Sequence, residues 1–312
     1  MSSNRRDFLK TLLAGSALAG LSVSPFKTFA NREYIKLTIL HTNDTHSHID
    51  PFPANDPKYP GMGGFARRAE IIKEIRNKEK NILLLDAGDI YQGTPYFNMY
   101  GGEPELKLMS LMGYDASTIG NHEFDNGLEG ILNKLPDATF PFINSNYDFS
   151  NTILAGKILP YKIFNIANIK IGVFGLGVEL EGLVNKTSYG NTVYLDPLKK
   201  ADEMTHILKD QLGCDLIICL SHMGYEYKSE DKKPSDFILA KQSKNIDLII
   251  GGHTHTFIDK PYKFYNSDNK EVYVCQVGWA GIKLGRLDFY IEAGSKKKFV
   301  DAHTINIFNN QA

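Results

Sequence analysis

The sequence is poor in cysteine and carries little net charge. Its 312 residues include three cysteines, an odd and sparse set that excludes a disulfide framework. Cys219 lies within the apolar run 216–220, so we interpret Cys214, Cys219 and Cys275 as structural thiols and not as a metal site. The formal net charge of −1 gives no sign of binding to a nucleic acid polymer or to an acidic membrane surface.

The N-terminal segment lacks an apolar run long enough for a transmembrane helix. Residues 11–23 are apolar but diluted by alanine and glycine, so we expect no stable membrane anchor. Two arginines at 5–6, followed by an apolar pair and a lysine, match a twin-arginine export signal, and residues 28–30 offer a small-x-small cleavage site. A basic amphipathic surface helix is the alternative. We predict that residues 1–30 are a signal peptide and that the protein is exported, for example to the periplasm.

The remaining residues, 31–312, are enough for one large α/β domain and short for two. Apolar runs of strand length alternate with segments of helical spacing, which indicates an α/β architecture. Residues 159–176, and the segment from residue 271 onward, are typical of antiparallel hairpins and meanders. The expected buried strands are 35–41, 81–86, 115–119, 216–220 and 246–250, and the expected helices are 64–78, 104–112, 197–212 and 234–243.

Each of these five strands is followed by a short group rich in Asp, Asn or His. The carboxyl ends of parallel strands lie along one sheet edge, so we expect the five groups to converge on a single crevice. Seven potential ligands exceed what one ion takes from protein side chains, which predicts two divalent ions that share a bridging carboxylate. The candidate ligands are Asp44, His46, Asp89, Asn121, His222, His253 and His255.

The order of these groups resembles that of a known family. The sequence is similar to the calcineurin-like metallophosphoesterases, and among them to the periplasmic 5′-nucleotidases and UDP-sugar hydrolases, from about residue 37 to residue 285. The resemblance implies a four-layered α/β/β/α sandwich with a dinuclear metal site at the strand carboxyl ends. The motifs that carry it are LHTNDTH at 40–46, GD at 88–89, GNHEFD at 120–125, SHMG at 221–224 and GGHTH at 251–255.

The resemblance also implies how the ligands are shared between the ions. One ion would be held by Asp44, His46, Asp89 and His255, and the other by Asp89, Asn121, His222 and His253. Asp89 would then be the bridge. Imidazole with carboxylate, and no thiolate, suits Mn, Zn, Fe or Co better than an ion bound by oxygen alone, and we expect Mn or Zn. Some family members carry Gln at the position of His255, which leaves the metal open.

Two further residues are expected to take part in catalysis. His122 follows the candidate ligand Asn121 and should point into the cleft, where it would stabilise the transition state or protonate the leaving alcohol. Asp125 would orient its imidazole, as in the family's His/Asp dyad. The chain is therefore expected to be an enzyme, a phosphatase that cleaves 5′-nucleotides or related phosphate esters with water activated by the two ions.

Other functions remain open at this point. A thiosulfate-ester hydrolase and a cyclic-nucleotide or sugar-phosphate phosphodiesterase would use the same framework. A non-catalytic, metal-stabilised binding module would not need His122 and Asp125. Family members usually continue into a second domain that binds the nucleoside, whereas this sequence ends at Ala312. The resemblance therefore leads us to expect that a separate exported protein recognises the nucleoside, or that this recognition is missing.

Overall fold

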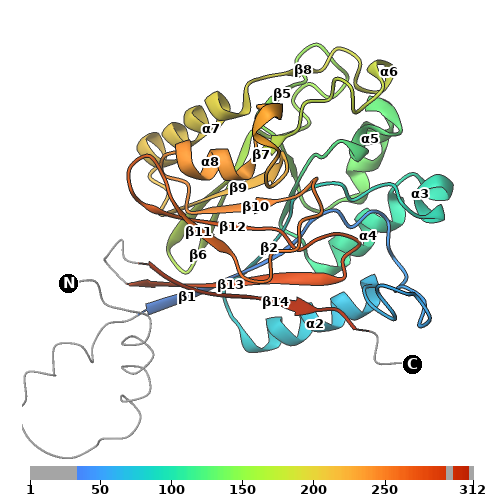
Figure 1. The fold of residues 1–312 in the computed structure, drawn as a ribbon, viewed down its shortest axis with the longest axis horizontal. Coiled ribbons are helices and arrows are strands. Elements are labelled where there is room, and N and C mark those ends of the chain that lie inside the picture. The colour runs from blue at the N-terminus through green and yellow to red at the C-terminus, as the bar shows by residue number, and fades with distance from the viewer. Residues whose placement is uncertain (1–33, 293–297, 309–312) are drawn as a thin grey trace, which may run out of the picture.

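Two mixed six-stranded sheets form the centre of the molecule (Figure 1). The computed structural model describes residues 34–292 and 298–308, so the expected signal peptide lies outside the described residues. The first sheet has the order β14 (Lys298–Asn306), β13 (Lys283–Glu292), β1 (Tyr34–Thr42), β2 (Ile82–Asp86), β3 (Ala116–Thr118) and β4 (Phe142–Ile143). The second has the order β11 (Tyr262–Tyr265), β12 (Glu271–Cys275), β10 (Leu248–Gly251), β9 (Leu216–His222), β7 (Ile169–Gly177) and β6 (Tyr161–Ile166).

Helices cover the outer face of each sheet (Figure 1). Against the first sheet lie α2 (Phe65–Lys78), α4 (Glu103–Met112) and α5 (Gly127–Lys134), and against the second lie α7 (Pro197–His206) and α8 (Asp236–Gln242). Shorter elements are α3 (Pro95–Tyr100), α6 (Lys186–Tyr189), the ladder of β5 (Tyr147–Asp148) with β8 (Val193–Tyr194), and the turns η2 (His122–Phe124), η3 (Leu135–Asp137), η4 (Ile207–Gln211) and η5 (Ser229–Asp231). Among the described residues, no helix combines the length and apolar character needed to span a bilayer.

Three apolar cores hold these layers together. The middle core lies between the sheets, where Leu37 and Ile39 of β1 meet Ile171 of β7 and Ile218 of β9. All four side chains have no exposed surface. Strands that are buried on both faces carry nearly continuous apolar runs, which is why the sequence pattern identified them. The outer cores lie between each sheet and its helices, so the expected four-layered α/β/β/α sandwich is confirmed.

The expected elements are found, with two differences. The segment 197–212 is an α-helix only to His206 and continues as a π-helical turn in η4. The segment from residue 271 onward was expected to be antiparallel throughout, and this is wrong for β12. That strand pairs antiparallel with β11 but parallel with β10, because it is inserted beside the central parallel strands. The β6–β7 hairpin is confirmed.

Gly175 in β7 allows the two sheets to approach each other closely. A Cβ at this position would collide with the backbone carbonyl oxygen of Ile143 in β4, which cannot move without shifting its strand. We expect Gly175→Ala to lower the free energy of unfolding by about 1–3 kcal/mol. Gly172→Ala in the same strand is the matched control, since the flexible tip of Leu208 can move away from its Cβ. Urea denaturation of both variants provides the comparison, and equal stabilities would contradict this account.

Candidate metal centre

All seven candidate ligands lie at the carboxyl ends of parallel strands. Asp44 and His46 follow β1, Asp89 follows β2 and Asn121 follows β3, all in the first sheet. The second sheet supplies His222 at the end of β9, and His253 and His255 after β10. The middle core holds these two sheet edges together, so the side chains of both sheets meet at one place.

Within this place the side chains form two groups. In the first, Nε2 of His255 lies 3.0 Å from Nε2 of His46 and 3.3 Å from Oδ1 of Asp44. The second consists of Asp89, His222 and His253, and in each group the potential ligand atoms all lie within 4.8 Å of one another. The amide oxygen of Asn121 lies 2.8 Å from Nδ1 of His253 and so joins the second group.

Asp89 connects the two groups. Its Oδ2 lies 3.0 Å from Nε2 of His222 and 3.9 Å from Nε2 of His46, so one carboxylate oxygen faces both groups. Its Oδ1 accepts a hydrogen bond from the backbone N–H of His122 at 2.8 Å. This is the arrangement that a carboxylate shared between two cations requires.

The backbone is strained at most of these positions. Five of the seven residues have positive φ angles: Asp44 (48°), His46 (48°), Asp89 (54°), His253 (71°) and His255 (51°). Residues other than glycine rarely adopt this conformation, which costs of order 1–3 kcal/mol each. Such strain persists where a structure directs side chains to a functional site, so its concentration here supports a role in binding or catalysis.

Backbone carbonyl groups set the tautomers of two histidines. Nδ1 of His222 donates to the carbonyl oxygen of Ala87 at 2.7 Å, and Nδ1 of His46 donates to that of Tyr91 at 3.1 Å. A carbonyl oxygen can only accept, so Nδ1 carries a proton and Nε2 faces the site, where its lone pair is available to a cation that displaces any second proton. This is the state in which histidine binds a metal.

The pair of His222 and Asp89 needs a positive charge between its atoms. Nε2 of His222 is buried and makes no hydrogen bond of good geometry, although it lies 3.0 Å from the carboxylate. Without a cation, a second proton must occupy this position. Burial lowers the pKa of His222, but the nearby Asp89 carboxylate raises it more, to about 10. The buried donor set therefore fits a divalent cation, which would replace that proton.

Glu123 supports the loops that carry the ligands, and its place in the GNHEFD motif was the only sequence signal for this role. Its buried carboxylate accepts backbone N–H bonds from Asp89 at 3.0 Å, Gly120 at 2.6 Å and Ile90 at 2.7 Å. Burial and the Asp89 charge raise its pKa to about 7. One side chain thus ties the loop after β2 to the loop after β3.

Asn43 plays a corresponding part for Asp44. Its amide nitrogen donates to Oδ2 of Asp44 at 2.6 Å, and its amide oxygen accepts the backbone N–H of Val277 at 2.9 Å. The backbone N–H of His253 also donates to the Asp44 carboxylate, at 3.0 Å. Asp44 is therefore oriented by groups from both sheets. The only sequence signal for Asn43 was its place beside a candidate ligand.

An aromatic cluster borders the first group of ligands. The ring of Trp279 stacks on His255 with 5.7 Å between centroids and 4° between planes, and His48 meets Trp279 edge-on at 5.3 Å. Phe52, from the Pro/Gly-rich loop, stacks on His48 at 4.8 Å. Burial lowers the pKa of His48 to about 4, so this imidazole is neutral and packs as an aromatic ring.

The His122–Asp125 dyad lies beside the centre and is partly exposed. Nδ1 of His122 lies 2.8 Å from Oδ2 of Asp125, and both side chains are about one-third exposed. The hydrogen bond to Asp125 raises the pKa of His122. Its ring centroid lies 5.3 Å from that of His46, so the imidazole is next to the metal centre but belongs to neither ligand group.

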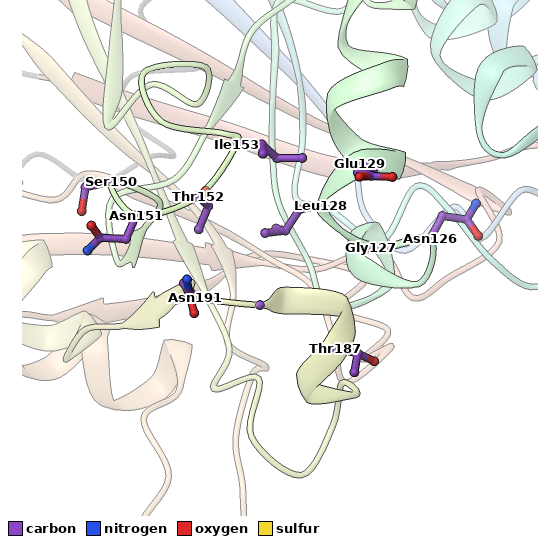
Figure 2. Close-up of a pocket in the computed structure, with 11 residues that line it drawn as sticks. Asn126, Gly127, Leu128, Glu129, Ser150, Asn151, Thr152, Ile153, Thr187 and Asn191 are labelled. Atoms are coloured by element: carbon purple, nitrogen blue, oxygen red, sulfur yellow. The ribbon is translucent and has the colours of Figure 1, made fainter.

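The described residues line a larger and a smaller cavity. The larger, of about 640 Å³, lies between the start of α5, residues 150–153 and the segment that ends at Asn191 (Figure 2). Asn126, directly after Asp125, is part of its lining, but none of the candidate ligands is. The smaller, of about 210 Å³, is lined in part by His253 and thus adjoins the metal centre.

Comparison with known proteins agrees with this geometry. Residues 37–257 match the calcineurin-like phosphoesterases. The chain belongs to this family. It is 37% identical to a snake venom 5′-nucleotidase of Crotalus adamanteus over 275 residues, which cover 81% of this chain and 45% of that protein. The chain thus spans about half the length of the curated relatives it matches. The expected fold, and the expectation of a phosphoesterase, are confirmed.

Solved structures show the same fold. The 5′-nucleotidase precursor of Thermus thermophilus superposes with a TM-score of 0.79 at 30% identity, over 88% of this chain and 55% of that chain. The calcineurin-like phosphoesterase YfkN of Bacillus subtilis gives a TM-score of 0.71 at 27% identity, over 88% of this chain and 91% of that chain. This family is metal-dependent, and the two ligand groups are where this chain can hold its metal.

We expect Glu123→Ala to lower the affinity for divalent metal about 10- to 100-fold, because the loops that carry Asp89 and Asn121 lose their common anchor. Metal-depleted protein can be titrated with Mn²⁺ while the emission of Trp279 is followed. This is the single tryptophan of the chain, and its ring stacks on His255. Glu129→Ala, which removes an exposed carboxylate six residues later, is the control. An unchanged titration in Glu123→Ala would exclude the anchoring role.

Proposed function

We propose that this chain is an exported hydrolase of phosphomonoesters, with 5′-nucleotides as its main substrates, and that two divalent ions serve the reaction. The observation that carries the proposal is the pair of ligand groups joined by Asp89. The names of the relatives support nucleotides as the substrate class. The donor set of imidazole, carboxylate and amide oxygen favours Mn²⁺ or Zn²⁺.

The proposed ligand sets follow the two groups. One ion would be held by Asp44, His46, Asp89 and His255, and the other by Asp89, Asn121, His222 and His253. When bound, two such ions lower the pKa of water and neutralise phosphoryl oxygens. The chain's own contribution is to hold the donors in place, through the carbonyl groups on His46 and His222 and through Glu123 behind Asp89.

His122 is the proposed catalytic residue outside the ligand sets. Because Nδ1 of His122 is hydrogen-bonded to Asp125, its Nε2 is available to interact with the substrate. A protonated imidazole there can donate to a phosphoryl oxygen or to the leaving alcohol as negative charge develops. Asp125 orients the ring and favours its protonated form. A binding module without catalysis would have no need for this dyad beside its ligands.

Variants of Asp89 and His122 separate metal binding from catalysis. We expect Asp89→Ala to lose both ions, because one carboxylate faces both groups. His122→Ala should keep both ions and turn over about 10²- to 10⁴-fold more slowly. Metal content by elemental analysis and turnover of an aryl phosphate give the comparison. A metal-depleted His122→Ala protein would make His122 a ligand and remove it from the catalytic role.

Removal of the metal tests the whole proposal. Chelation should abolish hydrolysis of AMP and of an aryl phosphate, and added Mn²⁺ should restore it. A panel that also contains a phosphodiester, a sugar phosphate and a thiosulfate ester distinguishes the alternative activities. Turnover that persists in protein shown by elemental analysis to be metal-free would rule out the proposed mechanism.

Export depends on residues outside the described part of the chain. The proposed centre combines loops from five strand ends, so it can form only after folding, and the twin-arginine route carries folded proteins. We expect replacement of Arg5 and Arg6 by Lys to leave unprocessed precursor in the cytoplasm. Cell fractionation with detection of precursor and mature forms measures this. Undiminished mature protein outside the cytoplasm would contradict the assignment.

A further inference from the structure

The smaller cavity opens beside the candidate ligand His253. Met223, directly after the candidate ligand His222, also lines it, so the cavity is adjacent to the metal centre at two residues. Its volume is about 210 Å³, and a water molecule takes up about 30 Å³ in the liquid, so it has room for about seven waters. A single ring system fills such a space. The larger cavity in Figure 2 has no candidate ligand in its lining, and neither a cation nor an aromatic ring.

Two tyrosines form aromatic walls of the smaller cavity. Burial raises the pKa of both Tyr194 and Tyr227, so the two phenols are neutral. The hydroxyl of Tyr227 donates to the carbonyl oxygen of Met223 at 2.6 Å, which fixes the ring. Gly224, with φ of 92°, makes room for it, since a Cβ there would collide with the Tyr227 hydroxyl. The ring is held in place before any ligand binds.

Charged side chains of both signs also line this cavity: Lys233, Glu179 and Glu181. The ammonium of Lys233 lies 5.5 Å from the centroid of the Tyr227 ring. Within the described part of the chain, none of Lys233, Glu179 and Glu181 forms an ion pair. One ammonium and two carboxylates in one small cavity provide both donors and acceptors. They match a neutral ligand with hydroxyl and amide groups better than a second anion.

We propose that this cavity binds the nucleoside of a nucleotide whose phosphate lies at the metal centre. The base or the ribose would lie against Tyr227, with Lys233 and Glu179 at its polar groups. The inference rests on the function proposed above. It gives this chain nucleoside contacts of its own, whereas the sequence led us to expect that a separate exported protein supplies them or that they are missing. Stacking on a tyrosine tolerates any base, so we expect selection for nucleosides in general and weak preference among bases.

Variants of Tyr227 test the proposal through substrate selectivity. The measured quantity is the ratio of kcat/KM for AMP to kcat/KM for glycerol 3-phosphate, whose alcohol has no ring. We expect this ratio to fall about tenfold in Tyr227→Leu and to stay within about twofold in Tyr227→Phe, which keeps the ring. Tyr265→Leu, at an exposed tyrosine of β11, is the matched control. A ratio that Tyr227→Leu leaves unchanged would overturn the proposal.

A binding measurement separates this inference from the proposed function. Calorimetry with adenosine, which has no phosphate, needs neither metal nor turnover. We expect wild-type protein and Tyr227→Phe to bind adenosine, and Tyr227→Leu to bind it about tenfold more weakly. If the metal-loaded protein hydrolyses neither AMP nor glycerol 3-phosphate, the proposed function fails. Adenosine binding then still shows whether the cavity binds a nucleoside. Equal adenosine affinity in wild type and Tyr227→Leu, or none in wild type, would refute the site.

Discussion

The burial of carboxylates at the joint edge of two sheets is the constraint on which the rest of the site depends. Asp44, Asp89 and Glu123 are all at most 2% exposed. An unpaired buried carboxylate costs several kcal/mol, so each needs N–H donors, imidazoles or a cation around it. The backbone N–H of His253 donates a hydrogen bond to Asp44, and that of His122 donates one to Asp89. Three other backbone N–H groups donate to Glu123. The negative charge that remains faces the imidazole nitrogens, and a bound cation would interact favourably with both.

This constraint explains why the strained backbone is concentrated in the ligand loops. The strands end in a rigid, fully packed core, so the loops after them must turn at once to bring Asp44, Asp89 and His253 together. Positive φ angles give that turn and cost stability. The three cores and the network of Glu123 offset this cost. Rigid donors then need little reorganisation when a metal binds, which favours tight and selective binding.

The surroundings of the centre differ from one side to the other. The packed rings of Trp279 and His48 border the side of His255, while the cavity of Tyr227 lies on the side of His253. The dyad of His122 and Asp125 lies next to His46 and is partly exposed. In the proposed reaction the centre binds the phosphate common to all substrates. The cavity of Tyr227 then discriminates between the alcohol groups that the phosphate is bonded to.

The sequence by itself determined the alternation of strands and helices and the positions of the seven candidate ligands. Both are local signals, because burial on two faces gives apolar runs and motif residues sit directly after them. Only the tertiary structure decided the parallel pairing of β12, the roles of Glu123 and Trp279, and the cavity beside His253. These depend on contacts between distant residues, such as Asp44 with His253, 209 positions apart. No local pattern encodes such contacts, since packing of the two sheets creates them.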